Sequence, residues 1–149
     1  MPRVFDCVIL DDQLNFLETR FRAYRDIPEV THVICEAVVD SKGRPKPLYF
    51  QDTRDNRFLP FRGKWNHVTV AADELSPGIS YQDSLRAYLL YGVNGEPGDI
   101  VLQEYDTIPS VKAIRDLAAG RLSSPDALTL RWRVHKAGTL TASLIRGNM

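Results

Sequence analysis

A strand, a helix and a second strand follow one another at the start of the chain, and this order constrains the fold more than any other feature. Val4 to Leu10 is an apolar run interrupted only by Asp6, which is typical of a buried strand. From about Gln13 to Asp26, apolar residues recur at spacings of three and four, which predicts a helix. Thr31 to Val38 is apolar again and predicts a second strand. A connection of this length favours a parallel crossover and therefore an α/β fold.

The rest of the chain repeats this alternation and then changes. Further apolar runs and stripes predict strands over Lys64 to Ala71 and from Asp99, and helices over Tyr81 to Val93 and from Pro109. Leu128 to His135 and Thr139 to Leu144 instead alternate apolar and polar residues around an Ala-Gly pair, which predicts an antiparallel hairpin. The predicted fold is a mostly parallel sheet flanked by helices, with this hairpin at the C-terminal end. Arg54 to Arg62 shows no clear period and is not assigned.

The bulk composition narrows the class of protein. The chain has 149 residues, 44% of them hydrophobic, which fits one globular domain over residues 1–149 and excludes a disordered chain. Its 19 basic and 19 acidic residues balance, which argues against a dedicated nucleic-acid binder. No signal peptide is visible and no apolar run approaches the roughly 20 residues of a membrane span. Cys7 and Cys35 lie in apolar runs, where they are expected to act as small reduced hydrophobes, so we expect a cytoplasmic protein.

Two carboxylates follow the strand that begins at Asp99. Glu104 and Asp106 are two residues apart, so on an extended chain their side chains point to the same side. In open α/β sheets, ligands bind outside the carboxyl ends of the strands. Converging carboxylates there suit a hard divalent cation, and a divalent cation suits a diphosphate. The pair therefore predicts the geometry that a nucleotide-sugar transferase needs; the alternative is a solvated acidic loop.

Four stretches of the chain together carry a family resemblance: Val4 to Leu10 with the helix after it, Val33 to Ala37, Gly43 to Phe50, and Asp99 to Pro109. They resemble the family 17 glycosyltransferases, inverting enzymes typified by the β-1,4-N-acetylglucosaminyltransferase that bisects N-glycans. The third reads Gly-Arg-Pro-Lys-Pro-Leu-Tyr-Phe, very close to the family's Gly-Lys-Pro-Lys-Pro-Leu-Tyr-Phe. The fourth matches the strand that carries the family's Asp-x-Asp-Glu-Ile-Pro. The order and spacing of the stretches agree over about residues 3–120.

The resemblance implies a GT-A fold, a Rossmann-like sheet that uses a UDP-sugar and Mn²⁺ or Mg²⁺. On this basis Asp106 is the first choice of metal ligand, and Glu104 is the second or acts through water. From its own chemistry His135 could be a third ligand, since imidazole accepts Mn²⁺. The alternative for His135 is a solvated strand face shared with Arg131 and Arg133. Glu36 is expected to accept hydrogen bonds from the nucleotide base or ribose; the alternative is a solvated strand end.

Other residues are candidates for binding the donor or for moving a proton. Arg86 could hold a phosphate or the base edge, or be an exposed helix residue. Lys46 could reach the donor or the acceptor, or its loop could only brace the fold. An inverting transfer needs a base for the acceptor hydroxyl. Asp83 and Asp11 are the candidates, and Asp11 fits donor binding or a helix cap better. His32 and His67 are expected to be structural.

The chain departs from the family pattern in ways that leave two functions open. Glu104 replaces the first acid of the Asp-x-Asp motif, and Thr107 replaces the acid that follows the motif. The first function is a metal-dependent inverting transferase of bacterial or viral type, which moves a hexose or N-acetylhexosamine from a UDP-sugar. Its acceptor could be a protein, a glycan, a lipid or modified DNA, and self-association through the hairpin edge could supply an acceptor wall. The second is a non-catalytic relative that binds a nucleotide or a partner protein.

Overall fold

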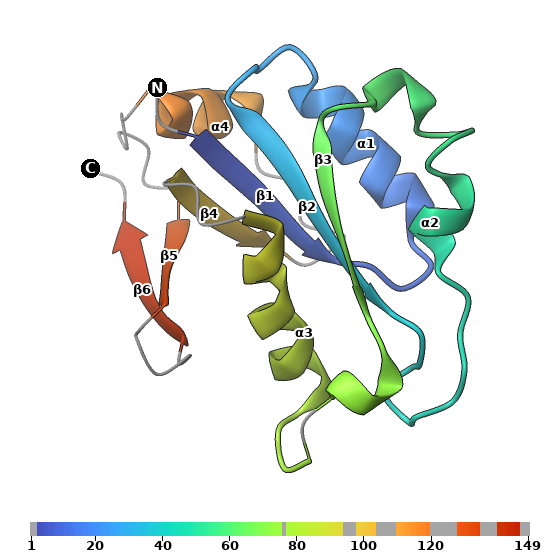
Figure 1. Ribbon diagram of the computed structural model, residues 1–149. Helices are drawn as coiled ribbons and strands as arrows, with labels where there is room; N and C mark the ends of the chain where they lie inside the picture. The colour runs from blue at the N-terminus through green and yellow to red at the C-terminus, as the bar shows by residue number, and fades with distance from the viewer. Residues whose placement is uncertain are drawn as a thin grey trace.

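Four parallel strands form the central sheet of this computed structural model, in the order β3-β2-β1-β4 (Figure 1). The structure describes residues 3–75, 77–93, 98–103, 110–119, 128–134 and 140–146. The strands are β1 (Arg3–Ile9), β2 (Val30–Ala37), β3 (Trp65–Val70), β4 (Gly98–Gln103), β5 (Leu128–Val134) and β6 (Leu140–Arg146). The α-helices are α1 (Leu14–Tyr24), α2 (Tyr49–Thr53), α3 (Tyr81–Leu89) and α4 (Val111–Ala118). Short 3₁₀ helices are η1 (Leu59–Phe61), η2 (Ala72–Glu74) and η3 (Leu90–Val93). The α/β class predicted from the sequence is confirmed.

The two central strands are buried on both faces because helices cover each side of the sheet. Successive side chains of β1 and β2 point to opposite faces. Phe5, Cys7, Val33 and Cys35 pack with Leu85 and other residues on the α3 side. On the opposite side, α1, α2 and α4 complete two apolar clusters: Leu10, Leu17, Phe21, Ile34, Phe50, Phe58 and Phe61 in one, and Val4, Tyr24, Ile27, Val30, Ile114, Leu117 and Ala118 in the other. Burial on both faces explains why these strands are almost continuously apolar.

The order of strands along the chain reverses between β1 and β4. β1 pairs in parallel with β4, with Val4 opposite Asp99 and Val8 opposite Gln103. On its other side, β1 pairs in parallel with β2. The carboxyl ends of β1 and β4 therefore lie next to each other. This is the topological switch point of an open α/β sheet, where such folds bind their ligands.

Element bounds differ from the sequence prediction at several points. The helix predicted up to Val93 ends at Leu89 and continues as the 3₁₀ helix η3. The unassigned aromatic stretch contains η1, whose Phe61 is buried, and α2 precedes it. β5 and β6 pair with each other in antiparallel register, as a sheet separate from the four parallel strands. A hairpin at the edge of the main sheet stays a prediction.

Both cysteines are buried and free, as predicted, in neighbouring strands. Burial raises the pKa of the Cys35 thiol to about 12 and that of Cys7 well above its ordinary value, so both stay protonated at neutral pH.

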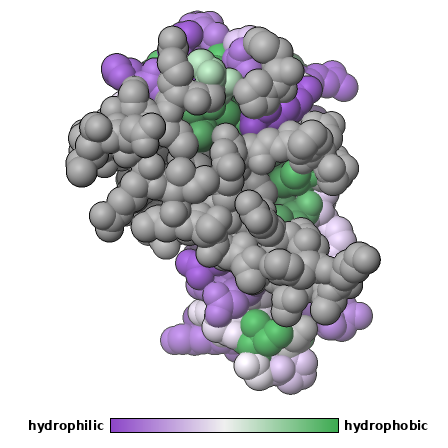
Figure 2. All heavy atoms as spheres, turned by 90° about the vertical axis from the view of Figure 1, so that its left-hand side faces the viewer, coloured by the Kyte–Doolittle hydropathy of each residue, from purple (hydrophilic) through white to green (hydrophobic). Residues whose placement is uncertain are grey.

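No helix in the described part of the chain is long and apolar enough to cross a membrane. Figure 2 shows the face at the left of Figure 1, where the described hydrophilic residues gather at the upper and lower ends and hydrophobic ones show only in small areas.

A buried ion pair joins β1 to α1 and β2. Arg20 donates from Nε to Asp6 Oδ2 at 3.0 Å and from its terminal nitrogen to Oδ1, so the contact is bidentate. His32 donates from Nδ1 to Asp6 Oδ2 at 2.8 Å. All three side chains are almost completely buried. Burial alone would raise the pKa of Asp6, but Arg20 and His32 outweigh it and hold this pKa far below its ordinary value. The expectation that His32 is structural is confirmed.

Replacing Gly92 by alanine is expected to destabilise the fold by about 1–3 kcal/mol, because the added methyl group overpacks the core. A Cβ built on Gly92 would lie 2.3 Å from Cγ1 of Val33 and 3.2 Å from Cγ2 of Val68. Val33 is fully buried in the core cluster on the α3 side of the sheet. Urea unfolding would measure the loss. In a double-mutant cycle with Val33→Ala, which removes the clashing methyl group, the two losses should not add; strict additivity would contradict the clash.

Candidate functional site

The carboxyl ends of the parallel strands bring together segments that are far apart in the sequence. Asp11 follows β1 and is exposed. The first residue of α3, Tyr81, donates its hydroxyl to the carbonyl oxygen of Val39, just after β2, at 2.8 Å. Burial is the main cause that raises the pKa of Tyr81 to about 12, and the negative charge of Asp11 is the second. Asp11, the start of α3 and the end of β2 therefore share one edge of the sheet, beside the switch point.

The helix α3 begins at this edge with a serine cap. Ser80 is the N-cap, and its Oγ accepts the backbone N–H of Asp83 at 3.1 Å. The Asp83 side chain in turn accepts a hydrogen bond from Arg86 at 3.1 Å, within the same helix. Two residues predicted for different tasks, a base and a phosphate ligand, are thus neighbours on an exposed surface. Sequence reasoning missed the cap, although Ser80 with an acid three residues later is a recognisable start signal.

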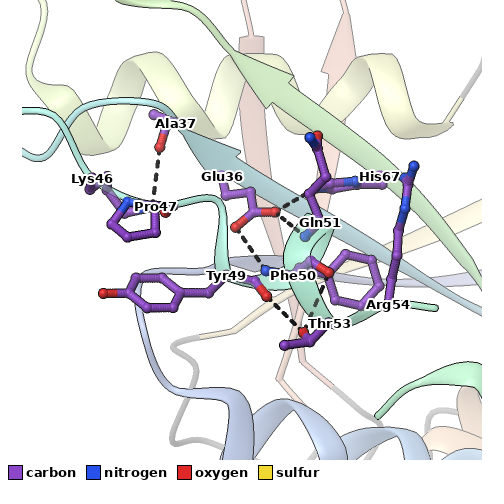
Figure 3. A network of polar contacts seen from close by, with 10 residues as sticks. All are labelled: Glu36, Ala37, Lys46, Pro47, Tyr49, Phe50, Gln51, Thr53, Arg54 and His67. Atoms are coloured by element: carbon purple, nitrogen blue, oxygen red, sulfur yellow. Dashed lines mark hydrogen bonds and ion pairs between the residues drawn. The ribbon is translucent and has the colours of Figure 1, made fainter. Parts of the chain in front are cut away.

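Glu36 is fully buried and binds the chain that returns over the sheet (Figure 3). Its Oε1 accepts the backbone N–H of Phe50 at 3.1 Å, and its Oε2 accepts that of Gln51 at 3.0 Å. These N–H groups belong to the first turn of α2, which has no cap from its own N-cap residue. Glu36 therefore supplies the cap from a strand 14 positions back in the sequence. Its predicted contact with a base or ribose stays a prediction.

His67 completes the Glu36 site and has a defined tautomer. Arg54 contacts Nδ1 of His67 at 3.2 Å, and Nε2 of His67 contacts Glu36 Oε2 at 2.7 Å. A guanidinium can only donate, so Nδ1 accepts and Nε2 carries the proton donated to the carboxylate. Burial alone would raise the pKa of Glu36, but the bonds from His67 and the two backbone N–H groups outweigh it and lower this pKa. His67 thus links Arg54 to Glu36, and its expected structural role stays a prediction.

Lys46 holds its own loop. Its Nζ donates to the carbonyl oxygens of Ala37 at 3.1 Å and Pro47 at 3.0 Å, and it lies 5.4 Å from the ring centre of Tyr49. The residues from Lys46 to Phe50 therefore fasten α2 to the end of β2 (Figure 3). Bracing was the alternative for this loop; a contact of Lys46 with a donor or acceptor stays a prediction.

The three predicted metal ligands, Glu104, Asp106 and His135, lie outside the described residues. Within the described part of the chain, no three His, Cys, Asp or Glu side chains lie close enough together to hold a metal ion. Glu104 directly follows β4, so the strand that precedes the acid pair is the one that lies beside β1 at the switch point.

Replacing Glu36 by glutamine is expected to lower the free energy of unfolding by about 1–3 kcal/mol, since one buried donor loses its partner. The amide keeps a single acceptor oxygen, while its NH₂ group faces the N–H of either Phe50 or Gln51. Glu74→Gln is a matched control, because Glu74 accepts one backbone N–H, that of Ala71, at an exposed site. Urea unfolding of both variants would measure the difference; an equal effect would contradict the capping role of Glu36.

Acid is expected to unfold the chain in a range set by Asp6 and Glu36. Both have a folded-state pKa below the ordinary value, so the folded state holds fewer protons than the unfolded chain. The stabilisation that the two carboxylates give the folded state is complete above their unfolded pKa values of about 4. It is lost as the pH falls from there toward the lower folded-state pKa values. Urea midpoints measured from neutral pH down to about pH 3 should fall most steeply below about pH 4.5. Asp6→Asn should flatten this dependence; an unchanged slope would contradict the assignment.

The chain matches no protein-family model and no curated protein.

Proposed function

We propose that this chain is a GT-A-like nucleotide-sugar transferase, which moves a hexose or N-acetylhexosamine from a UDP-sugar with inversion. The observation that supports the proposal is the parallel pairing of β1 with β4 at the reversal of strand order. Asp11, which is exposed, follows β1, and β1 pairs with the strand that leads into Glu104 and Asp106. Nucleotides bind at such an edge in open α/β sheets.

The charges of the proposed site suit a donor that leaves as a diphosphate. Carboxylate oxygens of Glu104 and Asp106 fit Mn²⁺ or Mg²⁺, and such a cation stabilises the charge that a diphosphate leaving group develops. Arg86, in the second turn of α3, is the candidate cation for a phosphate oxygen. For that role it would exchange its bond with Asp83, which would free this carboxylate to accept the proton of an acceptor hydroxyl.

The non-catalytic reading is the second candidate, and specific observations favour it. Glu36 and Lys46, both predicted to bind the donor, already bond to protein groups. Thr107 cannot act as the base that the family places at this position. A chain with these features could bind a nucleotide, or a partner protein, without transferring a sugar.

Titration calorimetry with UDP, with and without Mn²⁺, tests the proposal. A transferase of this kind should bind UDP with heat that depends on Mn²⁺, and should hydrolyse a UDP-sugar slowly when no acceptor is present. Mn²⁺-dependent binding without hydrolysis would favour the non-catalytic relative. Absence of UDP binding under both conditions would contradict nucleotide recognition altogether.

A further inference from the structure

One edge of the main sheet is open along β3. In the part of the chain that the structure describes, this strand pairs with β2 on one side and has no strand on the other. The backbone N–H of His32 donates to the carbonyl oxygen of Lys64, and the backbone N–H of Val38 donates to the carbonyl oxygen of Val70. In a parallel ladder, bonding to one neighbour uses alternate residues. The backbone N–H and C=O groups of Trp65, His67 and Thr69 therefore point outward, and no hydrogen bond between described residues uses them.

A hollow of about 700 Å³ runs along this edge. Arg54 and His67 line it from the α2 side of the sheet, and Tyr88, Tyr91 and Gly92 line it from the α3 side. Figure 1 shows β3 at the margin of the sheet, with α3 on one face and α1 and α2 on the other. The hollow is thus a valley between the two helical layers, with the open strand as its floor.

The two walls of the valley differ in chemistry. Arg54 is half-buried, contacts Nδ1 of His67, and has no carboxylate within ion-pair distance among the described residues. Glu74, the acid that lines the valley, is engaged by the N–H of Ala71. On the other wall, the rings of Tyr88 and Tyr91 stack with centres 5.4 Å apart, and Tyr91 is 69% exposed. One wall offers the positive charge of Arg54, and the other offers the two tyrosine rings with the carboxylate of Glu74 nearby.

We propose that this valley binds an extended peptide by strand addition to β3, with an acidic side chain at Arg54 and an adjacent apolar side chain on Tyr88 and Tyr91. Outward groups on every second residue match the repeat of an extended backbone, which favours a peptide over a glycan. Successive side chains of an added strand point to opposite faces. An acidic residue next to an apolar one therefore satisfies both walls at once. The proposal is independent of nucleotide binding at the switch point.

Selection from a phage-displayed library of random peptides of about eight residues, roughly the length of a strand, tests this binding mode. Enriched sequences should share an acidic residue beside an apolar or aromatic one. In NMR titrations with such a peptide, the amide signals of Trp65, His67 and Thr69 should move most. Arg54→Gln, which keeps a donor for His67, should weaken binding about tenfold, because a charge-assisted bond is lost.

Matched controls separate strand addition from general stickiness. Arg22→Gln changes an exposed arginine of α1 and should leave the affinity unchanged. A peptide N-methylated at the alternate amides that face β3 keeps its side chains but cannot pair with the strand, and should not bind. The proposal is overturned if no sequence is enriched, if the selected peptides bind the Arg54 and Arg22 variants equally, or if the shifted amides lie away from β3. The free protein could also be a dimer by sedimentation, with the β3 amides already protected from hydrogen exchange. That result would assign the edge to a second copy of the chain and would also overturn the proposal.

Discussion

Replacing Asp6 by alanine is expected to cost about 3–5 kcal/mol of the free energy of unfolding, the range found when one partner of a buried ion pair is removed. The Arg20 guanidinium, fully buried, would keep its charge and lose both carboxylate oxygens. His32 would lose the acceptor of its Nδ1 proton. Urea unfolding at neutral pH would measure the loss, and the variant should unfold at much lower urea.

Glu18→Ala is the matched control, because it removes an arginine–carboxylate pair from the same helix at the surface. Glu18 accepts from Arg57 at 3.0 Å, but both side chains remain partly exposed. Such pairs contribute about 0–1 kcal/mol, since water screens the charges and replaces the bonds. Its small effect should also shrink in high salt, whereas that of Asp6→Ala should not. Similar losses in the two variants would show that the buried network is worth no more than a surface pair.

The central fold could be predicted because its elements carry their own periodicity. Leu17, Phe21 and Tyr24 lie at helical spacing and are all buried on α1. The apolar runs around Cys7 and Cys35 become the two strands buried on both faces. In each case the signal is local, since residues of one segment share one buried surface.

Features that depend on partners distant in sequence could not be predicted. The five residues of α2 are too few to show a period, and the helix is capped by Glu36 from β2. A carboxylate at a strand end looks solvated until the chain folds back over it. Asp6 looked like an interruption of an apolar run, because its partner Arg20 reaches it only when α1 packs on the sheet. The acid pair at Glu104 and Asp106 rests on sequence alone, since it lies outside the described residues.

Replacing Asp106 by asparagine is therefore the decisive change for the proposed transferase. An amide oxygen is a neutral and weaker ligand for Mn²⁺ than a carboxylate, so the cation that stabilises the leaving diphosphate would be held poorly. Metal-dependent hydrolysis of a UDP-sugar should fall at least about a hundredfold, since a metal contributes several kcal/mol and each 1.4 kcal/mol is tenfold in rate. Calorimetry should show a parallel loss of Mn²⁺-dependent UDP binding.

Two controls make the result specific to the proposed metal site. Asp55→Asn makes the same chemical change at an exposed position beyond α2 and should leave hydrolysis intact. Glu104→Asp keeps a carboxylate ligand on a side chain that is one methylene shorter, and should retain part of the activity. Both site variants should unfold at the urea concentration of the parent chain, so that lost activity reflects lost metal rather than lost fold. If Asp106→Asn hydrolysed the donor as fast as the parent, with the same dependence on Mn²⁺, the cation would have to bind elsewhere, and the β1–β4 edge would not be the site of sugar transfer.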